Sequence, residues 1–190
     1  TMFKYSPKTK VTSQITLPYS GTGFVFNLDK KTNTIFVNMT SWSKAIQEFE
    51  INLDNNQTQL SKFNKQNVYP KEFEDIVVEE VEVTGHDGVK IPLSLIYKKG
   101  LEKNGENVCI MESYGAYGAS MTPYFNYSTI YLVTKGVVLA YPHVRGSREK
   151  GNAWYKAGFK TTKPNTWKDF NSCAEYLIKN GYTSPKHLAG

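Results

Sequence analysis

Cysteine is scarce in this sequence. Of the 190 residues only Cys109 and Cys173 are cysteines, and neither lies in a C-x-x-C pair or near a histidine at ligand spacing. A structural zinc site is therefore not expected. Cys109 lies in an apolar run and Cys173 on one face of a predicted helix, so both are predicted to be small core residues.

Long apolar runs and dense charge clusters are also missing. The longest apolar run, residues 136–141, is far too short to span a bilayer, and residues 1–10 lack the apolar stretch of a signal peptide. The net charge is +6, but the basic residues are scattered, so neither nucleic-acid nor membrane binding is expected. We expect a cytoplasmic protein. A periplasmic or secreted location stays open because the sequence reads as part of a longer chain.

The composition is that of a globular protein, with 39% hydrophobic and 14% aromatic residues. Apolar and polar residues alternate in residues 23–29, 34–41 and 46–53, which predicts short strands, and the polar residues 54–59 predict a turn after them. A polar stretch containing Pro70 indicates a domain boundary near Tyr69-Pro70. The first part of the chain is therefore predicted to be all β, as in a sandwich or a propeller blade.

The second part alternates predicted strands and helices. In chain order we expect a hairpin at 77–85 and 89–100 around Asp87-Gly88, a central strand at 107–113, a helix at 126–136, a strand at 137–144, a long helix at 166–180 and a further strand after residue 183. Asn165 or Thr166 is expected to cap the long helix, and Gly181 to follow its end. This order is typical of an α/β domain with a partly parallel sheet.

Residues 112–125, ESYGAYGASMTPYF, follow the predicted central strand. This segment is too rich in glycine for a regular element and too aromatic for an ordinary solvated loop. In α/β sheets the ligand site lies beyond the carboxyl ends of the strands, so this segment and residues 143–151 are predicted to border one site. Tyr114 and Tyr117 could offer hydroxyls and rings there, although packing residues on a bent loop are the commoner case.

The remaining polar candidates carry weaker signals. Arg145 could bind a carboxylate, but an ion pair with Glu149 or another acid is the favoured interpretation. His143 ends a buried strand, where histidine is more often a hydrogen-bonded core residue than a base. The sequence contains no G-x-S-x-G, G-x-G-x-x-G or P-loop pattern.

Four motifs together resemble the prolyl oligopeptidase family of serine peptidases. They are Tyr114-Gly-x-Tyr117, Arg145-Gly146, Trp154-x-Lys-x-Gly158, and the run AEYLIKNGYTSP at residues 174–185. The resemblance is strong over residues 70–190 and weak before them. It implies the fold class: a partial α/β-hydrolase domain at residues 70–190, preceded at residues 1–69 by the end of a β-propeller.

The resemblance also implies site roles. The tyrosine matching Tyr114 donates its hydroxyl to the oxyanion of the tetrahedral intermediate, and the residue matching Tyr117 forms a wall of the pocket for the side chain before the scissile bond. Arg145 is a further candidate for substrate binding. The family's serine, aspartate and histidine come later, beyond Gly190, so the remainder of the chain is expected to be needed for catalysis on short peptides. No cofactor or metal is implied.

Within the family, two substrate preferences are open. Thr122 and Tyr124 stand where the oligopeptidase B branch has acidic residues that hold a basic side chain, and Arg148 adds a positive charge nearby. Cleavage after proline is therefore favoured. The alternatives are cleavage after Lys or Arg, a non-catalytic peptide-binding member of the same fold, and another α/β-hydrolase such as an esterase.

Overall fold

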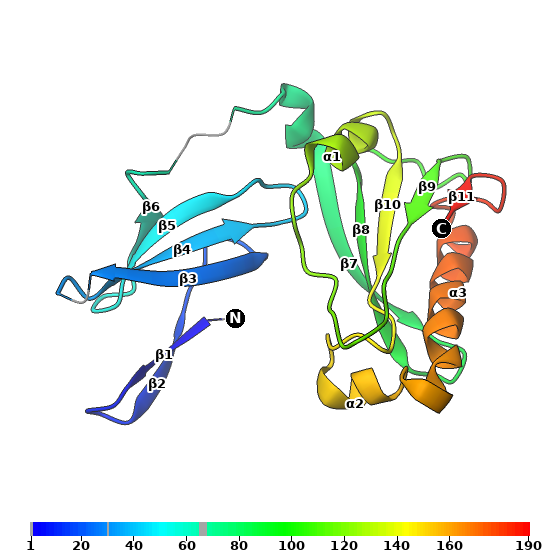
Figure 1. The fold of residues 1–190 in the computed structure, drawn as a ribbon. Helices are drawn as coiled ribbons and strands as arrows, with labels where there is room; N and C mark the ends of the chain where they lie inside the picture. Colours follow the sequence, from blue (N-terminus) through cyan, green and yellow to red (C-terminus); the bar gives the residue numbers. More distant parts are fainter. Residues whose placement is uncertain (1, 30, 65–67) are drawn as a thin grey trace. The chain divides into compact units, whose positions relative to one another are not determined.

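A computed structural model describes residues 2–29, 31–64 and 68–190 (Figure 1). Residues 65–67, within the predicted boundary segment, lie outside the described residues. The chain divides into two compact units. The first contains Thr1–Tyr69 with Thr122–Asn126, and the second contains Pro70–Met121 with Tyr127–Gly190.

The first unit is built from antiparallel strands. They are β1 (Met2–Ser6), β2 (Val11–Ile15), β3 (Thr22–Asp29), β4 (Thr34–Thr40), β5 (Gln47–Asn52) and β6 (Thr58–Leu60). β1 pairs with β2, and the other four form a sheet in the order β3-β4-β5-β6. The predicted strands are confirmed. The predicted turn at 54–59 is too long, because Thr58 and Gln59 already pair with β5.

Alternate residues of β4 and β5 form the core of this unit. Val37, Met39, Phe49 and Ile51 are buried together with Ile15 of β2. This spacing of two residues is what a sheet with one covered face requires. It explains why the alternating pattern identified these strands correctly.

The short segment Thr122–Asn126 returns to the first unit from later in the chain. The Thr22 hydroxyl donates a hydrogen bond of 2.7 Å to the carbonyl oxygen of Pro123. The ring of Phe125 lies 5.6 Å from the ring of Tyr69, edge to face. This segment falls within the expected 70–190 domain, yet its contacts belong to the β-rich unit.

The second unit contains a five-stranded mixed sheet. Its strands are β7 (Ile76–Thr84), β8 (Lys90–Lys98), β9 (Cys109–Met111), β10 (Val138–Pro142) and β11 (Leu188–Ala189), in the order β11-β9-β10-β8-β7. β7, β8 and β10 are antiparallel neighbours, whereas β10, β9 and β11 are parallel. Gly88 has a φ of 84° in the hairpin turn, as the Asp-Gly signal predicts. β9 has a strand on each side, as expected of a central strand.

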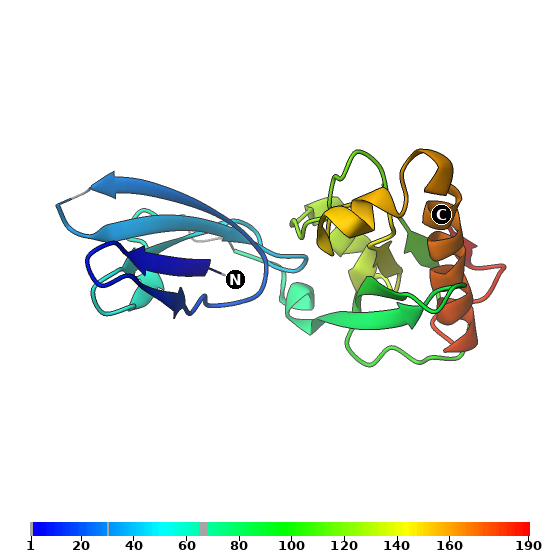
Figure 2. The ribbon, with the colours of Figure 1, turned by 90° about the horizontal axis from the view of Figure 1, so that it is seen from below.

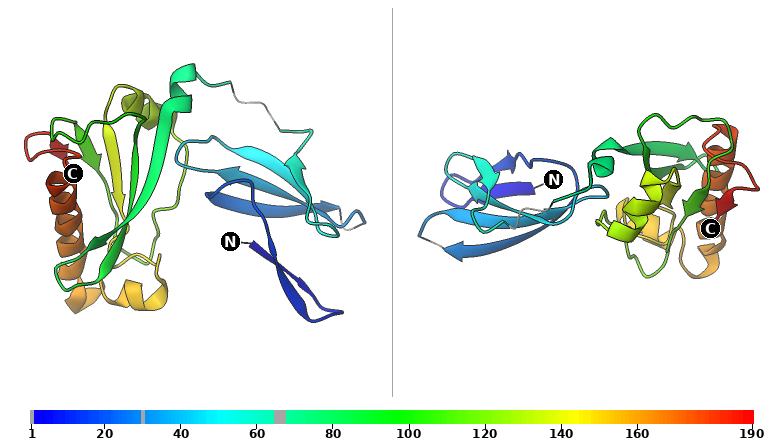
Figure 3. Two further views of the ribbon diagram at one scale, coloured as in Figure 1. Left: turned by 180° about the vertical axis from the view of Figure 1, so that it is seen from behind. Right: turned by 90° about the horizontal axis from the view of Figure 1, so that it is seen from above.

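Helices complete this unit. They are η1 (Lys71–Asp75), α1 (Tyr127–Thr134), α2 (Gly151–Lys156), η2 (Lys160–Thr162) and α3 (Pro164–Lys179). Figures 1 and 2 show α3 along one face of the sheet, and Figure 3 shows α2 close to the start of α3. The sequence pattern missed α2. Among the helices of the described residues, none is both long and apolar enough to cross a membrane.

The predicted start of α3, residue 166, is wrong by two residues. The helix begins at Pro164, and Lys163 at its N-cap makes no side-chain capping bond. The side chains expected to cap it bind elsewhere: Asn165 Nδ2 donates to the Ala157 carbonyl at 2.9 Å, and Thr166 Oγ1 to the Arg145 carbonyl at 2.7 Å. Both side chains therefore bind carbonyl oxygens outside the helix instead of capping its N-terminus.

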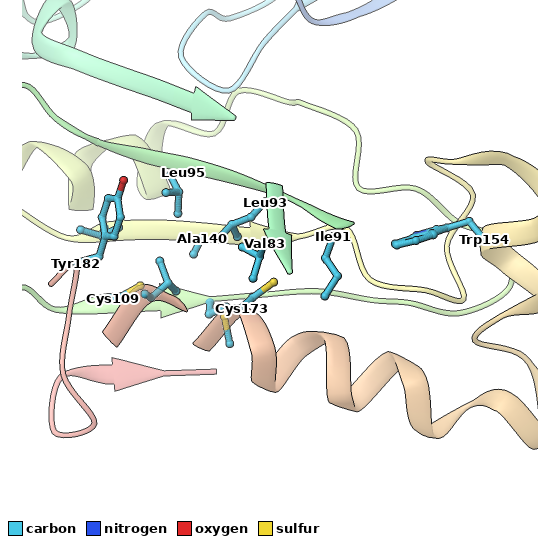
Figure 4. Packing of buried hydrophobic residues seen from close by; sticks show 12 residues of the cluster. Val83, Ile91, Leu93, Leu95, Cys109, Ala140, Trp154, Cys173 and Tyr182 are labelled. Atoms are coloured by element: carbon cyan, nitrogen blue, oxygen red, sulfur yellow. The ribbon is translucent and has the colours of Figure 1, made fainter. Parts of the chain in front are cut away.

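The core of the second unit lies between α3 and the sheet. Figure 4 shows Cys173 facing Val83, Leu93 and Ala140, with Cys109 beside them. Both cysteines are fully buried, which confirms the prediction that they are core residues. Burial raises the pKa of each thiol to about 12, so both stay protonated at neutral pH.

Candidate active site

Two loops leave the same edge of the sheet, because β9 and β10 are parallel. We call residues 112–121, after β9, the tyrosine loop, and residues 143–150, after β10, the arginine loop. The backbone N–H of Gly118 donates a hydrogen bond of 3.0 Å to the carbonyl oxygen of Gly146. The two loops are thus in contact, while their role as the border of one site stays a prediction.

Glycine is required where the backbones of the two loops cross. Gly115 has a φ of 59°, and a Cβ there would lie 2.4 Å from Thr166 Cγ2 and 2.6 Å from Val144 Cγ2. Gly146 has a φ of 97°, and its Cβ would lie 2.1 Å from the Gly115 carbonyl oxygen. Any side chain at either position would separate the loops. The glycines of the motifs therefore serve a close approach between backbones.

Tyr114 is half-exposed at the start of this crossing, with 54% of its surface accessible. It lines a cavity of about 430 Å³ together with Ser113, Val144, Lys163, Thr166, Trp167, Phe170 and Asn171. Among the hydrogen bonds of the described residues, none involves the Tyr114 hydroxyl. This hydroxyl is a donor held at the carboxyl end of a central strand and open to a ligand.

Tyr117 is 85% exposed and does not line this cavity. Its φ is 52°, in the left-handed region that a bulky residue seldom adopts. Such strain persists only where the surrounding structure imposes it, and it is commonest at functional sites. With this backbone conformation the Tyr117 ring faces solvent rather than the core, as its exposed fraction shows.

Arg145 is buried between two carboxylates. Its Nε and Nη2 donate to Asp169 at 2.8 and 2.5 Å, and its Nη1 donates to Asp87 at 2.5 Å. The hydrogen bond from Arg145 lowers the pKa of Asp87, and the hydrogen bonds to Asp169 raise the pKa of Arg145. This geometry fits the ion-pair interpretation of Arg145 rather than the substrate-binding one. The partners are Asp87 and Asp169 instead of the Glu149 suggested by proximity in sequence.

His143 belongs to a buried chain of polar groups that no sequence signal revealed. Its Nε2 lies 2.7 Å from Ser94 Oγ, and its Nδ1 lies 3.2 Å from Glu149 Oε1. The order of groups is that of a Ser-His-acid relay. However, Ser94 is only 1% exposed and also donates to Glu80 at 2.8 Å, so no substrate can reach it. The arrangement is structural, which agrees with the expectation of a hydrogen-bonded core histidine.

Glu149 links this buried chain to the tyrosine loop. Its Oε1 accepts a hydrogen bond of 2.8 Å from the backbone N–H of Met121. Burial raises the pKa of Glu149, but hydrogen bonds from His143, Ser147 and Met121 outweigh it and leave the pKa below its ordinary value. A charged Glu149 therefore fastens the end of the tyrosine loop near neutral pH.

Lys163 was also missed by sequence reasoning. Its Nζ donates a hydrogen bond to the carbonyl oxygen of Gly115, and it lines the same cavity as Tyr114. Burial lowers the pKa of this lysine. In the part of the chain that the structure describes, no cluster of His, Cys, Asp or Glu is arranged to hold a metal ion.

Comparison with known proteins places this geometry in a family. Residues 123–190 match the prolyl oligopeptidase family. The prolyl endopeptidase of Elizabethkingia meningoseptica is 34% identical over 186 residues, which is 98% of this chain and 26% of that protein. The chain thus spans about a quarter of the length of this relative.

Solved structures of the same family have a similar fold. A structure from a study of two prolyl endopeptidases superposes with a TM-score of 0.83 at 29% identity, over 94% of this chain and 26% of the other. Oligopeptidase B from Leishmania major gives a TM-score of 0.78 at 25% identity, over 98% of this chain and 27% of the other. The expected fold class, part of an α/β-hydrolase domain preceded by the end of a β-propeller, is confirmed by these likenesses. The chain belongs to the prolyl oligopeptidase family.

Proposed function

We propose that the protein containing this chain is a serine-type endopeptidase that hydrolyses short peptides after proline. In this proposal residues 1–69 are the end of the propeller and residues 70–190 the first part of the catalytic domain. The observation that carries it is the Tyr114 hydroxyl, which is unpaired among the described residues and lies at the rim of a cavity beyond the carboxyl ends of parallel strands.

The proposed role of Tyr114 follows from the charge that peptide hydrolysis creates. When a serine attacks the scissile carbonyl, its oxygen becomes an oxyanion, and a fixed donor aimed at that oxygen stabilises the transition state by about 3 kcal/mol. A tyrosine hydroxyl suits this role because it donates without carrying a charge of its own. The nucleophile, its histidine and its acid would come from the remainder of the protein, and no cofactor takes part.

Tyr117 is proposed to form a wall of the pocket for the residue before the scissile bond. Its exposed ring offers an apolar face of the size of a proline ring. The left-handed backbone of Tyr117 and the Gly118–Gly146 hydrogen bond next to it fix where the ring leaves the loop.

Arg148 supports proline over a basic residue at that position. A Cβ on Gly118 of the tyrosine loop would lie 3.2 Å from Arg148 Nε, so this cation sits directly beside the loop. Its guanidinium carbon also lies 5.7 Å from the centre of the Tyr155 ring. A positive charge here disfavours a Lys or Arg side chain in a neighbouring pocket. Cleavage after Lys or Arg is the second candidate, favoured by the similarity to oligopeptidase B.

Tyr114→Phe in the full-length protein tests the proposal, because it removes one hydroxyl and keeps the ring. We expect kcat/KM on a reporter peptide with proline before the scissile bond to fall by about two to three powers of ten, with little change in peptide binding. Tyr131→Phe is the matched control, since Tyr131 on α1 is 55% exposed against 54% for Tyr114.

An unchanged kcat/KM in folded Tyr114→Phe would show that another group is the oxyanion donor. Faster cleavage of an arginine reporter than of the proline reporter by the unmodified protein would favour the second candidate. Binding of both peptides without any turnover would favour a non-catalytic member of the family.

A further inference from the structure

Two hydrogen bonds hold the backbone on either side of Tyr114. Before it, Ser113 Oγ donates to the Pro142 carbonyl oxygen at 2.7 Å. After it, Lys163 Nζ donates to the carbonyl oxygen of Gly115. Because the Tyr114 side chain is half-exposed, packing restrains it only in part, and its direction depends also on this backbone. The second bond comes from a side chain 48 residues away in sequence.

The peptide group that Lys163 binds lies at the tightest point of the site. The Gly115 carbonyl oxygen is the atom that a Cβ on Gly146 would approach to 2.1 Å. A rotation of this peptide would therefore collide with the arginine loop or swing Tyr114 out of position. A fixed donor at this carbonyl removes that freedom.

A lysine at position 163 does not stabilise the N-terminus of α3. Lys163 is the N-cap of α3, and the first turn of α3 contains no Asp or Glu. The macrodipole of a helix disfavours a cation at its N-terminus, and burial further lowers the pKa of this lysine. A residue that breaks a local rule in this way is a candidate for a functional role.

We propose that Lys163 is a positioning residue for the oxyanion donor: its ammonium group fixes the Gly115 peptide and thereby holds the Tyr114 hydroxyl where the developing oxyanion forms. This inference rests on the proposed function of Tyr114. It predicts that Lys163 matters for the transition state and little for the binding of the substrate.

The test uses Lys163→Met in the full-length protein, which keeps an apolar stem and removes the donor. Because a misplacement of about 1 Å can cost about a hundredfold in rate, we expect kcat to fall by about ten- to a hundredfold with KM nearly unchanged. Lys163→Arg keeps a charged donor and should recover part of the loss. Lys168→Met, on the exposed surface of α3, is the control and should stay within about twofold of the unmodified protein.

A double-mutant cycle with Tyr114→Phe separates positioning from general destabilisation. If Lys163 acts through the Tyr114 hydroxyl, Lys163→Met should have almost no further effect on kcat once that hydroxyl is gone. A loss of the same factor in both backgrounds, or no loss at all, would overturn the inference. Should Lys163→Met not fold, as judged by its thermal melting, Lys163→Gln takes its place in the cycle.

The same cycle distinguishes the two proposals. If Tyr114→Phe itself leaves kcat unchanged, the proposed function of Tyr114 fails and the role of Lys163 fails with it. If Tyr114→Phe is strongly impaired but Lys163→Met is silent or purely additive, only the positioning role is wrong.

Discussion

The ion pair between Arg145 and Asp169 leads to the sharpest prediction on stability. Asp169 is fully buried and accepts three hydrogen bonds from Arg145: from the backbone N–H at 2.9 Å, from Nε at 2.8 Å and from Nη2 at 2.5 Å. Asp169→Asn keeps the shape of the side chain but removes its charge and turns one acceptor into a donor that faces the guanidinium. Of the two carboxylates that bind Arg145, only Asp87 would remain, and its side chain is 41% exposed.

The size of the effect follows from the burial of the two partners. Breaking a buried pair by altering one partner costs about 3–5 kcal/mol, because the other charge stays buried without compensation. The remaining Asp87 offsets part of this cost, so we expect a loss near the lower end, about 3 kcal/mol in the free energy of local opening. Asp87→Asn is the matched control. The Asp87 side chain is 41% exposed, so water can solvate it, and ion pairs with an exposed partner contribute about 1 kcal/mol or less.

Hydrogen–deuterium exchange of the full-length protein, read by mass spectrometry, would localise the change. A loss of about 3 kcal/mol corresponds to about a hundredfold faster exchange. In Asp169→Asn it should appear in peptides covering residues 143–147 and residues 164–172, at the start of α3, and remain small in β7. If Asp169→Asn and Asp87→Asn speed exchange equally, and both by less than about fivefold, the buried pair is not what holds the arginine loop to α3.

Two further predictions follow from the loops. Arg148→Gln should raise kcat/KM for an arginine reporter relative to a proline reporter by about fivefold, because removing a nearby like charge close to water is worth about 1 kcal/mol. Arg148→Lys keeps the charge and should leave this ratio unchanged. An equal change for both reporters would mean that Arg148 does not interact with the charge of the substrate. For Glu149 the folded pKa lies below its ordinary value of 4.5, so its hold on Met121 should be complete above about pH 4.5 and lost as the pH falls through the lower folded pKa. Exchange of the tyrosine-loop amides, corrected for the intrinsic rate, should rise over that acidic range and lose this pH dependence in Glu149→Gln; the same pH dependence in both proteins would refute the clamp.

The local elements of this chain could be predicted from its sequence because their causes are local. Alternation with a period of two identified β4 and β5, since each needs one covered face. The Asp87-Gly88 pair identified the hairpin, because glycine adopts the positive φ of the turn without strain. The helical spacing of apolar residues identified α3. The family motif directed attention to Tyr114 through the residues around it, although its proposed role there stays a prediction.

The partners of the buried polar groups were decided only by the tertiary structure. Asp87 and Asp169 lie 58 and 24 residues from Arg145, and Lys163 lies 48 residues from Gly115. Such pairs depend on which strands are neighbours and on which face each side chain lies. Neither follows from spacing along the chain.

The same reason explains which acids pair with Arg145 and why one prediction failed. An ion pair with Glu149 or another acid was expected; Glu149 contacts Met121 and His143, and Asp87 and Asp169 are the acids that bind Arg145. The expected caps of α3 failed because Asn165 and Thr166 found carbonyl partners on other segments. A polar side chain binds whichever partner the fold brings within reach, and only the folded chain determines which one that is.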